Sequence, residues 1–158
     1  MELRICPIKG LYQLLRETDA ANCAAVISSS ADVDAERLTG ISYVFLQYDD
    51  VDTEIPGRSF SESDAARILG FLQKLGPEID TLWCCCDAGQ SRSPAVAAAI
   101  CRRWGLDDSH IWKDPRYRPN MLVFDLLTKA FGLPVSDEEK DFLLYTNRKP
   151  FRDAIRNQ

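Results

Sequence analysis

The chain alternates short apolar runs with longer stretches in which apolar and polar residues recur at helical spacing. Residues 24–29, Ala-Ala-Val-Ile-Ser-Ser, predict a short buried strand. Residues 41–47 predict a second strand because they are rich in β-branched and aromatic side chains, and residues 80–85 predict a third. Between the second and third strands, the acidic and turn-prone residues 48–57 predict a loop.

One helix is predicted before the third strand in the sequence, and another is predicted after it. Ser59 and Glu62 have the spacing of a capping box, and Gly76-Pro77 predicts the end of the helix that follows them. After the third strand, residues 93–104 form an alanine-rich run with a proline near its first turn, which predicts the other helix.

Two more helices are predicted further along the chain. One begins at Pro119-Asn120 and ends at Gly132. The other begins at Ser136, because Glu139 follows at capping-box spacing. Strands that alternate with helices predict an α/β fold with a central, mainly parallel sheet flanked by helices. No repeat or linker divides the sequence, so we expect one domain over residues 1–158.

The length and charge of the chain narrow the classes of function. A chain of 158 residues is the size of one ordinary domain, and its formal net charge is −5. The acidic balance argues against general binding of nucleic acids or anionic membranes. No apolar run reaches the roughly 20 residues of a membrane-spanning helix, and the first residues lack the apolar segment of a secretory signal. We therefore expect a cytoplasmic monomer without a nucleic-acid or membrane partner.

Six cysteines limit the metal and redox chemistry of the protein. Three of them are consecutive, which does not fit the spaced pairs of a disulfide scaffold. The single histidine, His110, does not complete a structural zinc set, so we expect reduced thiols, no metal and no cofactor. Free cysteine usually behaves as a small hydrophobic residue, which is the expectation for Cys6, Cys23, Cys84 and Cys101.

The segment from residue 86 to residue 93 carries the candidate chemistry. It runs from a predicted strand through a tight loop into a predicted helix, so its backbone N–H groups and the positive helix end form an anion site. Gly89 gives the loop conformational freedom, and the position of Cys86 favours the thiolate form of its side chain. The planar guanidinium of Arg92 can bind two phosphate oxygens. Together these features indicate cysteine-dependent phosphoryl transfer through a covalent intermediate.

These residues also form a family signature. The sequence Cys86-Asp87-Ala88-Gly89-Gln90-Ser91-Arg92-Ser93 has five residues between the cysteine and the arginine, and Pro94 follows at the helix start. It resembles the phosphate-binding loop of the dual-specificity branch of the protein tyrosine phosphatase superfamily. The resemblance covers residues 24–130 and is to the small bacterial single-domain members of that branch.

The resemblance implies a role for each residue of the loop. Cys86 would attack phosphorus and become phosphocysteine, and the hydroxyl of Ser93 would stabilise the departing thiolate during hydrolysis. An aspartate on an upstream loop would act first as acid and then as base. Asp50 fits that place best, ahead of Asp49 and Asp52. The phosphoryl oxygens would be held by Arg92 and by the backbone amides of Asp87, Ala88, Gly89, Gln90, Ser91 and Arg92.

The implied substrate is a phosphorylated protein or a small phosphomonoester, with phosphotyrosine-type esters foremost. The sequence departs from the family at Cys85, because the family places histidine immediately before the nucleophile. The alternative is therefore a catalytically impaired module that binds phosphorylated partners. An arsenate reductase, with Cys84 and Cys85 resolving an intermediate, is less favoured because its loop usually lies near the N-terminus. A rhodanese-like sulfurtransferase is weaker still.

The consecutive thiols also support a redox hypothesis. Cys86 could be oxidised to a disulfide with Cys85, Cys84 or a cysteine that the fold brings near, although disulfides between adjacent cysteines are strained.

Other residues near the site have structural interpretations. Asn120 is predicted to cap the helix that follows it. The side chain of Asp87 is predicted to point outward, where its charge would discourage polyanionic substrates, and His110 is predicted to lie on the surface. A solvated loop is predicted to carry the basic residues Lys113, Arg116 and Arg118, and a substrate-facing patch is the alternative.

Overall fold

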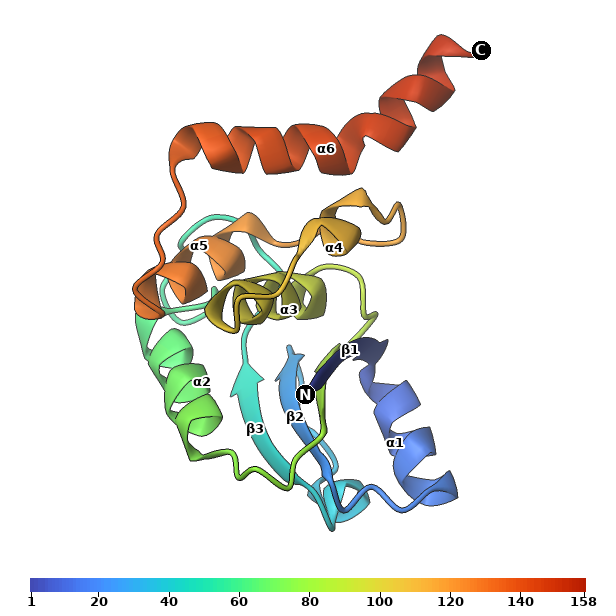
Figure 1. The fold of residues 1–158 in the computed structure, drawn as a ribbon, viewed down its shortest axis with the longest axis vertical. Coiled ribbons are helices and arrows are strands. Elements are labelled where there is room, and N and C mark those ends of the chain that lie inside the picture. The colour runs from blue at the N-terminus through green and yellow to red at the C-terminus, as the bar shows by residue number, and fades with distance from the viewer.

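The computed structural model describes residues 1–158 and contains a four-stranded sheet whose neighbouring strands are all parallel (Figure 1). The strand order is β1-β4-β2-β3, so the strand that leads into the signature lies between β1 and β2. The carboxyl ends of parallel strands meet at one edge of a sheet, which is where α/β proteins usually bind ligands. The strands are β1 (Glu2–Pro7), β2 (Cys23–Ser29), β3 (Ser42–Gln47) and β4 (Thr81–Cys86).

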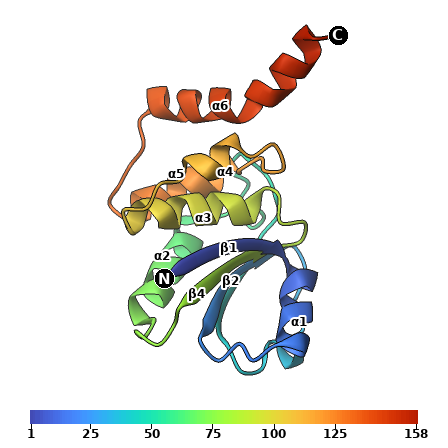
Figure 2. The same cartoon turned by 45° about the vertical axis from the view of Figure 1, so that its right-hand side comes forward.

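Helices cover both faces of this sheet (Figure 2). Helix α1 (Ile8–Glu17) packs on one face, while α2 (Glu62–Lys74) and α3 (Arg92–Arg103) pack on the other. This arrangement confirms the predicted α/β fold with a parallel sheet between helices. The remaining elements are the 3-10 helix η1 (Ala35–Leu38) and the helices α4 (Ser109–Lys113), α5 (Met121–Ala130) and α6 (Asp137–Arg156).

Strand β4 contributes to two apolar cores because its side chains alternate between the faces of the sheet. Leu82 and Cys84 belong to the larger core, beneath α2, α3 and α5. Cys85 belongs to the smaller core, beneath α1. Cys85 therefore faces away from its two cysteine neighbours, and Cys84 is the buried strand residue that the sequence predicts.

The predicted strands and most helix starts agree with the structure. Asn120 caps α5 by accepting a hydrogen bond from the amide of Val123, and Ser136 caps α6. The capping box predicted at Ser59 is wrong, because Ser61 and Asp64 form the capping box of α2. Ser59 instead bonds the backbone of Ile55, and the residue after it, Phe60, is fully buried.

The sequence analysis missed β1, α1 and α4. Strand β1 is an edge strand that pairs only with β4, a segment far along the chain. Helix α1 begins after Pro7 without a side-chain cap, so it lacks the local start signal on which the other helix predictions relied. Helix α4 has only five residues, and His110 is exposed on it as predicted.

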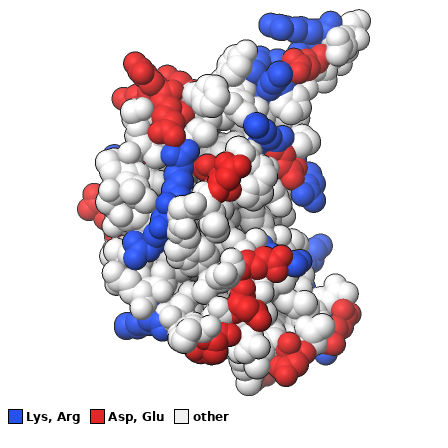
Figure 3. Space-filling view, in the orientation of Figure 1, with Lys and Arg blue, Asp and Glu red and all other residues white.

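The last helix, α6, lies across the body of the molecule, and its C-terminal part projects past it (Figures 1 and 2). Pro150 lies inside this helix. Lys and Arg side chains gather at the projecting end (Figure 3). None of the helices combines the length and the apolarity that crossing a bilayer requires.

Candidate active site

The candidate site is the loop that joins the end of β4 to the start of α3. Its glycine, Gly89, has a φ of +69°, a left-handed conformation that side chains with a Cβ rarely adopt. A Cβ at this position would lie 2.8 Å from the backbone nitrogen of Pro7 and 3.0 Å from the carbonyl carbon of Cys6. Only glycine therefore lets the loop rest directly on the end of β1.

The predicted nucleophile, Cys86, is the last residue of β4 and is 2% exposed. Its Sγ lies 3.0 Å from the Oγ of Ser93, in the first turn of α3. A hydroxyl at this distance can donate a hydrogen bond to a thiolate. The N-terminus of α3 adds the positive end of a helix to the same site.

The guanidinium of Arg92 is buried and held by groups that follow β2 and β3. Its Nη1 donates to the Oγ of Ser30 at 3.0 Å and to the carbonyl of Tyr48 at 2.8 Å. Its Nη2 donates to the carboxylate of Asp87 at 2.8 Å. The Nε of Arg92 is buried and has no hydrogen-bond partner. The arginine is thus fixed in place by three hydrogen bonds, with its Nε–H unused.

The side chain of Asp87 is exposed, as predicted, but its carboxylate also has partners beside the loop. Its carboxylate accepts a hydrogen bond from the hydroxyl of Ser29 at 2.7 Å and forms the ion pair with Arg92. Burial raises the pKa of this carboxyl, but the hydrogen bonds from Ser29 and Arg92 outweigh that effect and lower the pKa below its ordinary value. The carboxylate therefore orients Arg92, and only the backbone amide of Asp87 is in a position to serve an anion in the loop.

The three aspartates proposed as the acid differ in their side-chain contacts. Asp50 reaches the loop, because its Oδ1 accepts hydrogen bonds from the hydroxyl of Ser91 at 2.8 Å and from the side-chain amide of Asn120 at 2.9 Å. Asp49 bonds Arg58 at 2.9 Å instead, and this hydrogen bond lowers the pKa of Asp49. Asp52 lies in the lining of the adjacent cavity. Only Asp50 of the three touches the loop.

Asn120 has a role that the sequence analysis missed. Its side-chain oxygen caps α5 as predicted, but its side-chain nitrogen donates to Asp50 and to the carbonyl of Val51. Its backbone nitrogen donates to the carbonyl of Ser91 at 3.1 Å. The helix-cap pattern accounts for the oxygen of this amide and contains no signal for the nitrogen, because the contact joins segments 70 residues apart.

A cavity of about 520 Å³ opens beside the loop. Asp50 and Ser91 form the wall that it shares with the loop, and residues of α6 form another wall. Neither Cys86 nor Arg92 lines it, so it lies next to the loop rather than over Cys86. The lining residues are Asp50, Val51, Asp52, Thr53, Ile55, Ser91, Arg118, Pro119, Asn120, Met121, Leu144, Asn147 and Arg148.

The basic residues outside the loop have partners of their own. Arg116 forms an ion pair with Asp114, and the guanidinium of Arg118 lies 4.1 Å from the ring centre of Phe151 in α6. Both arginines are exposed, which agrees with the predicted solvated segment. The side chains do not bring together three groups suited to a metal ion.

The residue that replaces the family histidine, Cys85, contacts a residue of β1. Its Sγ lies 3.3 Å from the Sγ of Cys6, and both cysteines are in the reduced form. The two residues are direct partners in the pairing of β1 with β4.

No protein-family model and no curated protein matches this sequence. Among solved structures, PTPMT1 in complex with PI(5)P is 12% identical and has a TM-score of 0.53, over 81% of this chain and 87% of that chain. A second structure of PTPMT1 is 13% identical, also with a TM-score of 0.53, over 83% and 90%. The core catalytic domain of the PP-IP phosphatase SIW14 from S. cerevisiae is 16% identical, with a TM-score of 0.48, over 93% and 89%. The chain therefore shares the fold of PTPMT1.

Proposed function

We propose that the protein is a cysteine-dependent phosphomonoester hydrolase that acts through a phosphocysteine intermediate. One observation carries the proposal: Cys86 lies 3.0 Å from Ser93 at the head of a loop whose far end holds Asp50 through Ser91. A nucleophile, a hydroxyl donor and a carboxylic acid thus meet around one anion site. The fold shared with PTPMT1 supports this chemistry without establishing it.

In the first half-reaction, the thiolate of Cys86 attacks phosphorus. The S–P bond forms as the P–O bond to the leaving group breaks, and Asp50 donates its proton to the departing oxygen. The loop amides and Arg92 stabilise the negative charge on the three phosphoryl oxygens. The Oδ2 of Asp50 has no hydrogen-bond partner, so this oxygen is free to carry the transferred proton.

In the second half-reaction, water hydrolyses the phosphocysteine. The carboxylate of Asp50 takes a proton from the water while its oxygen attacks phosphorus and the S–P bond breaks. The hydroxyl of Ser93 stabilises the thiolate of Cys86 as it departs. Inorganic phosphate leaves, and the proton on Asp50 restores the acid for the next cycle.

The unused Nε donor of Arg92 supports an anionic ligand. Buried donors in proteins are nearly always satisfied, and a phosphoryl oxygen would supply the missing acceptor. PTPMT1 was crystallised with PI(5)P, a phosphorylated ligand. From this ligand we infer only that the substrates of the present protein are phosphomonoesters. We propose phosphotyrosine-type esters of proteins or small molecules as the first substrates to assay.

The first test is hydrolysis of para-nitrophenyl phosphate under reducing conditions without metal, measured from about pH 5 to 8. We expect turnover by the wild type and a loss of at least about 10³-fold in Cys86→Ser. Cys23→Ser, which removes a half-buried cysteine far from the loop along the sheet, is the control and should keep its activity. Equal rates for wild type and Cys86→Ser would refute the cysteine mechanism.

A second test concerns the acid. Asp50→Asn should slow hydrolysis of phenyl phosphate by about 10²-fold and that of para-nitrophenyl phosphate much less, because an activated leaving group needs less proton donation. Asp49→Asn is the matched control, since Asp49 bonds Arg58 and not the loop. If Asp49→Asn shows the leaving-group effect and Asp50→Asn does not, Asp50 is not the acid.

The observation that Cys85 stands in the place of the family histidine favours a second candidate, a phosphate-binding module without turnover. Such a module would bind vanadate and phosphate in wild type and Cys86→Ser alike, and neither would release para-nitrophenol.

A further inference from the structure

Two thiols that the proposed mechanism does not use lie together under the loop. Cys6 and Cys85 are paired residues of neighbouring strands, and their Sγ atoms are 3.3 Å apart. A disulfide requires a Cα–Cα distance of about 4.4–6.8 Å, and paired residues of adjacent strands lie within that range. Cys85 is completely buried, whereas Cys6 is half-buried.

The other cysteines have different surroundings. Cys84 faces the opposite core, and the Sγ of Cys86 contacts Ser93. No second pair of cysteines has sulfur atoms in contact. The redox hypothesis drawn from the sequence therefore applies to Cys6 and Cys85 instead of Cys86, because the fold gives Cys85 a partner in β1.

We propose that Cys6 and Cys85 form an oxidisable dithiol site, which a hydroperoxide converts to a disulfide. The sulfur of Cys6 attacks one peroxide oxygen, the O–O bond breaks, and Cys6 becomes a sulfenic acid as one water leaves. The thiol of Cys85 then loses its proton and attacks the Cys6 sulfur, the S–S bond forms, and a second water leaves. Two thiols lose two electrons, and one hydrogen peroxide becomes two waters. An external dithiol reverses the reaction.

The environment of the pair gives the two sulfurs different roles. The hydrogen bond from Cys85 lowers the pKa of Cys6 despite partial burial. The same hydrogen bond, together with complete burial, raises the pKa of Cys85. Cys6, which is the accessible member, therefore meets the oxidant first, and Cys85 resolves the sulfenic acid.

The disulfide would act on the anion loop through Gly89. This residue rests on the peptide bond between Cys6 and Pro7, where even a Cβ atom has no room. Closing an S–S bond of about 2.05 Å brings the sulfurs together from their 3.3 Å separation, and it ties the end of β1 on which Gly89 rests to the end of β4 that leads into Cys86. This consequence for the site rests on the proposed function, whereas formation of the disulfide does not.

The test uses Cys86→Ser, so that the proposed nucleophile cannot be oxidised. The full chain is treated with a small excess of hydrogen peroxide, blocked with N-ethylmaleimide and digested with trypsin. We expect the peptide from residues 5–9 to be joined to the peptide from residues 75–92, with two fewer blocked thiols and full reversal by dithiothreitol. A second change, Cys6→Ala or Cys85→Ala, should abolish the joined peptide, and Cys23→Ala should leave it intact.

A joined peptide that persists without Cys85 would overturn the assignment, as would failure to form it in a chain whose circular dichroism shows it to be folded. Either alanine variant suffices for the comparison, so misfolding of one does not remove the test.

Binding of inorganic phosphate to the same Cys86→Ser protein tests the coupling. We expect oxidation to weaken phosphate binding by about tenfold, given that ångström-scale misplacement can cost 10²-fold in a tightly organised site. Unchanged phosphate affinity in the joined protein would overturn the coupling to the loop. Absence of phosphate binding by the reduced protein would instead count against the proposed function, while the joined peptide would still establish the dithiol site.

Discussion

Helices α3 and α6 differ in how much of each helix is buried against the rest of the protein. Ten of the twelve residues of α3 are buried, whereas only Leu143 and Asn147 are buried among the twenty residues of α6. Large apolar side chains of α6 face solvent, with Phe142 at 65% and Tyr145 at 61% exposure. The helix that begins at the nucleophile loop is therefore fixed on all sides, and α6 is fixed on one.

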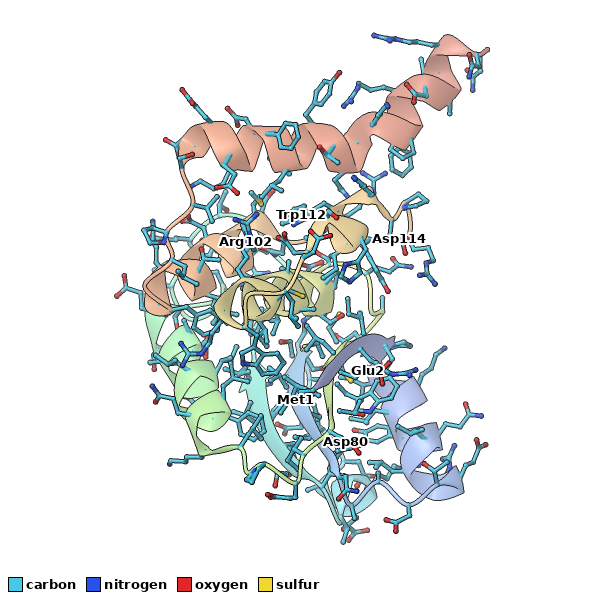
Figure 4. All side chains as sticks on the ribbon, in the orientation of Figure 1. Met1, Glu2, Asp80, Arg102, Trp112 and Asp114 are labelled. Carbon is cyan, nitrogen blue, oxygen red and sulfur yellow. The ribbon has the colours of Figure 1, made fainter.

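The contacts of α6 show what it contributes. The buried side chain of Asn147 donates hydrogen bonds to the carbonyls of Trp112 and Tyr117. Trp112 lies beneath α6 in the stick view, near Arg102 (Figure 4), and both side chains bond Asp108. Because Asn147 also lines the cavity, α6 provides a wall beside the site while α3 provides the site itself. Substitutions that act on one helix should leave the other largely unaffected.

The largest effect is expected at the start of α3, from Gly89→Ala. The left-handed conformation costs a residue with a Cβ about 1–2 kcal/mol, and the overlap with Pro7 adds roughly 1–3 kcal/mol as overpacking does. We expect urea unfolding to show a loss of about 3 kcal/mol, together with loss of turnover. Gly105→Ala is the matched control, because its φ is also +69° but nothing lies within 4 Å. Equal losses in both variants would contradict the role of the β1 contact.

A smaller effect is expected from Asn147→Ala in α6. Two buried carbonyls would lose their hydrogen bonds, at a combined cost of about 2 kcal/mol. Urea unfolding measures this loss, and hydrolysis of para-nitrophenyl phosphate should change less than about threefold because the loop is untouched. Lys149→Ala, an exposed change in the same helix, should stay within about 0.5 kcal/mol. A large loss of hydrolysis in Asn147→Ala would show that α6 affects the loop before α3.

The smallest effect is expected from Asp87→Asn, which removes the ion pair with Arg92. Because solvent screens a carboxylate that is 47% exposed, the loss at pH 7 should be under about 1 kcal/mol. The folded protein lowers the pKa of Asp87, so its stabilisation is present above the ordinary value of about 3.9 and is lost as pH falls through the lowered value. Thermal unfolding at pH 7 and near pH 3 should show the difference from wild type shrinking. A stability difference between wild type and Asp87→Asn that grows at low pH would contradict the lowered pKa of Asp87.

The strand, loop and helix around Cys86 could be predicted from the sequence because their signals are local. The apolar run before Cys86, the glycine at position 89 and the alanine-rich run after Ser93 specify strand, loop and helix within a single continuous segment. The cap residues Asn120 and Ser136 were predictable for the same reason, since a cap is a contact within three residues.

The contacts that complete the site could not be predicted, because they join distant segments. The bond from Asn120 to Asp50 spans 70 residues, and that from Arg92 to Ser30 spans 62. Asp87 illustrates the difference: its exposed place in the loop follows from the sequence, whereas its bonds to Ser29 and Arg92 join it to other elements and do not. The family resemblance favoured Asp50 over Asp49, and in the structure Asp50 bonds Ser91 of the loop whereas Asp49 bonds Arg58.

The place of β1 at the edge of the sheet has a consequence for the order of folding. Its partner β4 follows 79 residues later, so the N-terminal strand leaves the ribosome long before the strand that it must join. Pairings of such long sequence separation form slowly, because the loop between them must close first. The end of β1 under Gly89 and the strand that ends in Cys86 therefore come together only after at least the first 86 residues have been made, so the loop cannot reach its final geometry before then.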